Sequence, residues 1–100
     1  MSEGGIVSRG EGCYALSGDL TFATVPGLWR SGGTAFGNDA AVRLDLAGIT
    51  RVDSAGIALL IELTRAVRMH GGDILLEQPS PQLMAIATVS GLEEVLPFAR

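Results

Sequence analysis

The chain has 100 residues, of which 47% are hydrophobic and 18% are charged, and its formal net charge is −4 at pH 7. This length and composition are typical of a globular domain with an aliphatic core, and they exclude a disordered tail. All seven basic residues are arginines and they are scattered. The sequence therefore offers no phosphate-binding or Schiff-base lysine, and no polybasic tract for nucleic acid or a membrane surface.

Two features of the sequence indicate the cellular compartment. The single cysteine, Cys13, cannot form an internal disulfide, which favours a reducing environment. The first residues lack the charged start and apolar block of a secretory signal, and no apolar run approaches the roughly 20 residues that cross a bilayer. We therefore expect one cytoplasmic domain over residues 1–100, without insertion into a membrane.

The N-terminal third predicts a β-hairpin followed by an ambiguous segment. Strands are expected over 6–9 and 13–16, joined by a glycine-containing turn. The turn signal Ser17–Gly18–Asp19 should end the second strand. In the segment 22–36, Pro26 suits the first turn of a helix, whereas the glycines there disfavour one, so both readings stay open.

A half-covered strand is predicted over residues 41–46, because polar and apolar side chains alternate there. Arg43 and Asp45 point to one face, which should be at least partly in contact with water. The opposite face should be buried and carries the aliphatic side chains of Val42, Leu44 and Leu46.

The longest predicted helix runs from Ser54 to about Met69, with Ser54 as its N-cap and Gly71–Gly72 as its stop. Side chains at helical spacing form its buried stripe, and these are Ile57, Leu60, Ile61, Thr64 and Val67.

A strand over 73–77, with Ile74 and Leu76 inward, and a helix from Ser80 or Pro81 to about Val89 complete the pattern. Strands that alternate with helices in this order indicate the α/β class, with a β-α-β unit on a mixed sheet.

No catalytic constellation is evident. The only histidine, His70, lies a helix length from Ser54, roughly 24 Å at 1.5 Å per residue, so the two cannot form a dyad within the helix. Cys13 and His70 have no clustered partners at metal-ligand spacing. The loop before Ser54 is not glycine-rich and contains Asp53, which disfavours a nucleotide phosphate. We expect a protein that is not an enzyme and has no catalytic residues, cofactor or metal.

The stretch Asp53–Ser54–Ala55–Gly56 is the most informative part of the chain. A hydroxyl stands beside a carboxylate at a predicted helix start, and small residues leave the first turn open to a partner. Ser54 is interpreted either as a helix cap alone or as a cap that is also the centre of a docking surface.

At these residues the sequence resembles the STAS domain family, which includes the bacterial anti-sigma factor antagonists. The Asp-Ser-x-Gly element is the most specific part of the resemblance, which implies a small mixed sheet with helices packed mainly on one face. The segments that carry it are Leu16–Leu20, Leu44–Leu46, Val52–Leu60, Gly71–Gly72 and Ser90–Leu92.

Within the family, the sequence is most similar to the MlaB group, the cytoplasmic STAS subunits of Mla phospholipid-transport ABC systems. The supporting segments include Leu28–Trp29, Arg51–Asp53 and Val95–Pro97. The resemblance implies a non-catalytic subunit, peripheral to an inner-membrane complex, that binds and supports a MlaF-like ATPase and so helps to keep the outer membrane lipid-asymmetric. The expected partner-binding residues are Arg51, Asp53, Ser54, Ala55 and Gly56.

The same family implies an alternative. In anti-sigma factor antagonists the serine aligned with Ser54 is phosphorylated, so Ser54 is also a candidate phosphorylation site for an anti-sigma kinase in a partner-switching pathway. Ala55 stands where many antagonists have a second Ser or Thr, but the modified position itself is retained.

Overall fold

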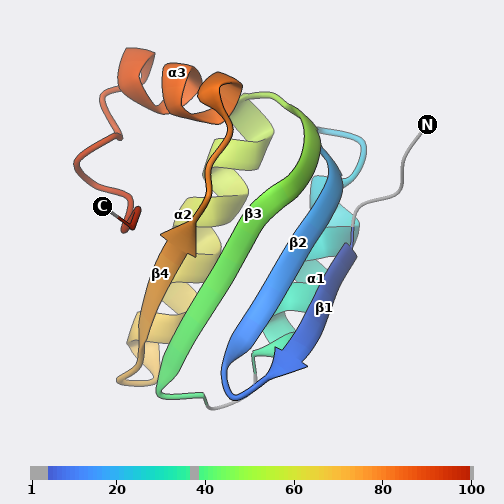
Figure 1. The fold of residues 1–100 in the computed structure, drawn as a ribbon, viewed down its shortest axis with the longest axis vertical. Helices are drawn as coiled ribbons and strands as arrows, with labels where there is room; N and C mark the ends of the chain where they lie inside the picture. The colour runs from blue at the N-terminus through green and yellow to red at the C-terminus, as the bar shows by residue number, and fades with distance from the viewer. Residues whose placement is uncertain (1–4, 37–38, 100) are drawn as a thin grey trace.

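The computed structural model describes residues 5–36 and 39–99 (Figure 1). In these residues one mixed sheet has the strand order β1-β2-β3-β4, with β1 antiparallel to β2 and the other neighbours parallel. The strands are β1 (Gly5–Gly10), β2 (Cys13–Leu20), β3 (Ala41–Val52) and β4 (Asp73–Glu77). The helices are α1 (Val25–Ala35), α2 (Ser54–Met69) and α3 (Pro81–Val89).

The helices cover one face of the sheet. Helices α1 and α2 lie behind the strands in Figure 1, and α3 lies at the end of the sheet where the parallel strands finish. The C-terminal segment returns beside β4, where Leu76 and Phe98 form an isolated bridge. This architecture confirms the predicted α/β class, with a mixed sheet and helices mainly on one side. None of the described helices is long and apolar enough to cross a membrane.

The core lies between the sheet and its helices. In β3 the alternation is as predicted, because Val42, Leu44 and Leu46 are buried while Arg43 is exposed. The predicted stripe of α2 is also confirmed at four positions, and Ile61 is only half-buried. The buried members of that stripe are Ile57, Leu60, Thr64 and Val67.

One prediction about local structure needs correction, and one segment that the sequence left open is decided. Strand β2 does not end at the turn signal but continues to Leu20, because its second half pairs with β3, which itself extends to Val52. Gly18 adopts a positive φ of 86° next to a break in register, so the turn-like sequence is absorbed as an irregularity within the ladder. The ambiguous segment after β2 does form helix α1, because burial of Leu28 against the core outweighs poor helix propensity.

The opposite face of the sheet carries paired charges. Arg9 contacts Asp45 at 2.8 Å, and Arg43 contacts Glu77 at 2.7 Å. The backbone N–H of Ala47 and then the Arg9 guanidinium lower the pKa of the Asp45 carboxyl below its usual value. The alternation of polar and apolar residues in β3 predicted this solvent-exposed face correctly.

A hydrogen bond joins Tyr14 to Asp39 at the end of the sheet where β3 begins. The Tyr14 hydroxyl donates a hydrogen bond to Asp39 Oδ2 at 2.5 Å, and the Tyr14 ring meets Phe36 edge-to-face with centroids 4.9 Å apart. The hydrogen bond to Asp39, followed by burial of the ring, raises the pKa of Tyr14 to about 12. The backbone carbonyls of Asp39 and Ala40 lie close to Gly72, just after α2.

Candidate functional site

The start of α2 is capped by Asp53 and not by Ser54, which corrects the sequence prediction. Asp53 has extended backbone angles, and its Oδ1 accepts a hydrogen bond from the N–H of Ala55 at 2.9 Å. Asp is as good an N-cap as Ser, and it stands one position earlier. Ser54 is therefore the first helical residue, and its exposed hydroxyl has no hydrogen-bond partner among residues 5–36 and 39–99.

Asp53 also ties the loop after β2 to the helix. Its second carboxylate oxygen accepts a hydrogen bond from the backbone N–H of Phe22 at 3.2 Å, and its own N–H donates to the Leu20 carbonyl at 3.2 Å. In the same loop, the Thr24 hydroxyl donates to the Asp19 carbonyl at 2.6 Å. These contacts hold Phe22, whose exposed fraction is 74%, beside the start of α2.

The result is a shallow groove of about 400 Å³ between the first turns of α1 and α2. None of the described residues that line it carries a charged side chain, and Ser54 supplies the hydroxyl. The lining residues are Phe22, Val25, Pro26, Ser54, Ala55 and Ala58. Sequence reasoning found Ser54 and Ala55. Ala58 was detectable as the residue one turn further along the same face, whereas the α1 side depends on a contact across 31 residues of sequence.

Gly56 serves the fold and does not face outward. A Cβ atom at this position would lie 2.6 Å from the Leu20 carbonyl oxygen and 2.9 Å from Val52 Cγ2. The missing side chain therefore lets α2 approach β2 and β3 closely. Gly56 is buried, so it supports the packing of α2 and offers no side chain to the surface.

The remaining predicted site residues take different places. Arg51 is exposed near the end of β3, opposite Asp19 in the parallel ladder, and it lies outside the lining of the groove. Asp53 is partly buried, and both of its carboxylate oxygens accept backbone hydrogen bonds. His70 is the C-cap of α2 and so lies at the opposite end of the helix from Ser54.

Comparisons with known proteins agree with this fold. The sequence profile of the family described as "Mlab, STAS domain" matches residues 8–97. No curated protein sequence is similar enough to count as a match.

Solved structures with the same fold include two of SpoIIAA. The anti-sigma factor antagonist SpoIIAA in its unphosphorylated form has 18% identity and a TM-score of 0.69, with 97% of this chain and 87% of that chain covered. The Bacillus cell-fate determinant SpoIIAA in its phosphorylated form has 20% identity and a TM-score of 0.69, with 97% and 91% covered.

A part of the murine anion transporter Slc26a9 is also similar, with 22% identity and a TM-score of 0.68. This likeness covers 89% of the present chain but 15% of the transporter. STAS domains are generally non-catalytic and bind protein partners. Because the family profile matches nearly the whole chain, the protein belongs to the STAS domain family, in the group named for MlaB.

Proposed function

We propose that this chain is a non-catalytic STAS subunit that binds and supports the ATPase of a Mla-type phospholipid-transport ABC system, which maintains outer-membrane lipid asymmetry. The observation that carries the proposal is the match to the family named for MlaB over residues 8–97. The neutral groove at the start of α2 is the proposed docking surface. The chain would then be cytoplasmic and would reach an inner-membrane complex through this MlaF-like ATPase.

The groove suits a partner that approaches the backbone closely. Ala55 and Ala58 add little bulk, and the exposed ring of Phe22 offers a large apolar surface next to them. The Ser54 hydroxyl can hydrogen-bond a polar group of the ATPase, and its loss would cost about 1–3 kcal/mol of binding free energy. Asp53 is a positioning residue in this interface, and Arg51 supplies a charge at its margin.

Co-purification with a Mla-type ATPase, together with the ATPase rate, tests the proposal. Ala58→Arg places a charged side chain in the neutral groove, and we expect it to weaken the complex by at least about tenfold. The matched control is Val89→Arg on α3, where the native side chain is 90% exposed and lies outside the groove. If Ala58→Arg binds and supports the ATPase as well as the control, the docking surface is elsewhere.

A second candidate function is that of an anti-sigma factor antagonist controlled by phosphorylation of Ser54. Two observations favour it, namely the fold likeness to SpoIIAA in both phosphorylation states and the exposure of the Ser54 hydroxyl. A phosphate would add about −1.5 to −2 charge. The positive end of the α2 dipole would tolerate this charge, but a partner fitted to the neutral groove would be released.

This candidate is tested by incubation with an anti-sigma serine kinase and ATP, followed by intact mass measurement. The antagonist role predicts one added phosphoryl group that disappears in Ser54→Ala. An unchanged mass with a kinase that is active on its own substrate would count against the role. A mass increase that persists in Ser54→Ala would place the modification at another residue.

A further inference from the structure

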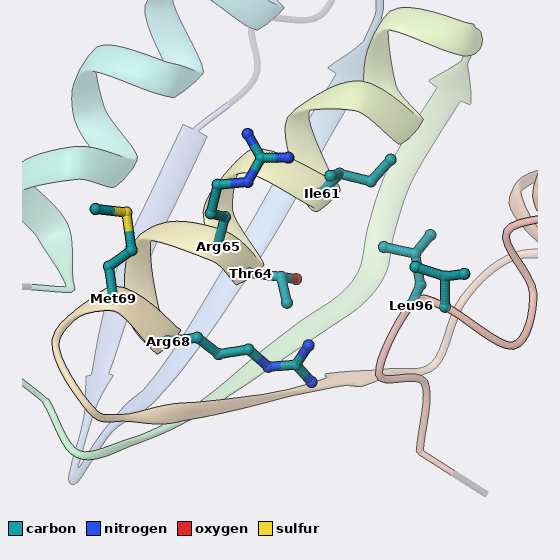
Figure 2. Close-up of a pocket in the computed structure, with 7 residues that line it drawn as sticks. Ile61, Thr64, Arg65, Arg68, Met69 and Leu96 are labelled. Atoms are coloured by element: carbon teal, nitrogen blue, oxygen red, sulfur yellow. The ribbon is translucent and has the colours of Figure 1, made fainter.

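A second groove, of about 370 Å³, lies along the C-terminal half of α2 (Figure 2). Its floor is apolar, with Leu96 buried and Ile61 half-buried. In Figure 2, Arg68 extends from α2 toward the segment that carries Leu96, while Arg65 and Met69 project from the same helix. The groove is therefore an apolar depression with two guanidinium groups at its border.

The two arginines form only weak ion pairs within their own chain. Arg65 Nη1 lies 3.0 Å from Glu62 Oε1, and Arg68 Nε lies 3.6 Å from Asp73 Oδ1. All four side chains are at least 45% exposed, and such surface pairs are worth about 0–1 kcal/mol. The arginines can thus change partners at little cost, although a bare anion would still have to compete with these carboxylates. An occupant that combines an apolar body with a carboxylate fits better.

This combination is present on the chain itself, next to the groove. Val95 forms part of the groove wall and is 60% exposed. Glu94, its neighbour, is exposed and makes no hydrogen bond or ion pair with any described residue. Met69, also at the border, is 79% exposed. A cationic groove and an acidic, apolar projection therefore stand side by side on one surface.

We propose that a second copy of this chain occupies the groove in a two-fold dimer. Val95 of each copy enters the groove of the other, and Glu94 of each copy faces Arg68 of the other. Two-fold symmetry makes every such contact twice, which is why a patch with both signs of charge suits a second copy better than an unrelated acidic ligand. The proposed contact involves few residues, whereas stable interfaces bury roughly 800 Å² per partner, so we expect the dimer to be weak and concentration-dependent.

This dimer does not depend on the docking role of the Ser54 groove. The two grooves share no lining residue, and Arg68 lies 14 residues after Ser54, roughly 21 Å along the helix axis.

Sedimentation velocity of the purified chain from about 10 μM to 1 mM tests the proposal, since weak homodimers populate in this range. We expect the mean mass to rise from monomer toward dimer. Glu94→Arg and Arg68→Glu each create two like-charge contacts across the dimer, and each should move the midpoint at least about tenfold higher in concentration. An equal mixture of the two variants should return the midpoint to within about twofold of the wild-type value, because every contact in the mixed dimer pairs opposite charges.

Val89→Asp, on α3 and outside the groove, is the control and should leave the midpoint unchanged. Near-ultraviolet circular dichroism checks that each variant is folded. A wild-type chain that stays monomeric throughout the range overturns the proposal. So does a dimer that neither charge reversal weakens, or whose loss in the two variants is not restored by mixing them.

Discussion

The two ends of α2 carry grooves of similar volume, about 400 and 370 Å³, but they are built in different ways. At the N-terminal end the shape is set by the backbone. Asp53 binds two backbone N–H groups there, and Gly56 lies against the Leu20 carbonyl. At the C-terminal end the border is set by long, half-exposed side chains, Arg65 and Arg68, in loose ion pairs.

This difference bears on what each end can recognise. A groove with a fixed backbone and no charged lining selects by shape, and it excludes charge because a buried unpaired charge is costly. A groove bordered by half-exposed charges selects by electrostatics, so binding there should weaken with added salt. The following predictions test how far the two ends differ, from the largest expected effect to the smallest.

Gly56→Ala should destabilise the fold by about 3 kcal/mol, because the new methyl group would overlap a backbone carbonyl that cannot easily move. Gly27→Ala in α1 is the matched control, since a Cβ there meets nothing within 4 Å. The control should be neutral or more stable by up to about 1 kcal/mol, because alanine is the better helix former. Chemical denaturation measures both, and equal effects would refute close packing at the N-terminal end.

Near the C-terminal end of α2, the hydrogen bond from Tyr14 to Asp39 should make stability sensitive to alkali. The pKa of Tyr14 is about 12 in the fold and about 10 in an unfolded chain. The folded state therefore holds the proton more tightly, so the contribution is fully present below pH 10 and is lost as the pH rises toward 12. The loss should reach about 2–3 kcal/mol.

The chain has one tyrosine and no lysine, so the alkaline titration is readily assigned. Absorbance of the phenolate and denaturation at each pH measure the effect, and Tyr14→Phe should remove the dependence between pH 10 and 12. A tyrosine that titrates near 10 in the folded protein would show that the contact with Asp39 does not form.

Asp53→Ala should cost about 1–2 kcal/mol of stability, because it removes the cap of α2 and the acceptor for Phe22. Ser54→Ala should change stability by less than about 0.5 kcal/mol, since its hydroxyl caps nothing and alanine favours the helix. Thermal or chemical denaturation of the two variants distinguishes them. A larger loss of stability in Ser54→Ala than in Asp53→Ala would identify Ser54 as the cap and contradict capping by Asp53.

Glu62→Gln should have the smallest effect, a loss of less than about 0.5 kcal/mol, because the Glu62–Arg65 pair is exposed on both sides. Denaturation at low and high salt measures it, and the small loss should disappear at high salt. A loss above about 1 kcal/mol that persists in high salt would mean that the C-terminal end is as rigidly built as the other.

Much of the fold could be predicted because local patterns and tertiary packing agree. The alternation in β3, four of the five positions in the stripe of α2 and the bounds of α3 appear as expected. Local signals were wrong, or left the structure undecided, where they competed with a distant partner. The turn-like Ser17–Gly18–Asp19 stays in β2 because β3 pairs with it, and α1 forms because Leu28 is buried.

For the candidate site, the sequence alone determined that the start of α2 would be small, polar and accessible, since Ser54 and Ala55 are adjacent in the chain. It could not determine which residue caps the helix, because Asp53 and Ser54 are both good caps and the choice depends on backbone angles. The sequence also could not show that Phe22 lies beside Ser54 or that Gly56 points inward. Those results require the loop after β2 and helix α2 to meet, and only the tertiary structure brings such distant segments together.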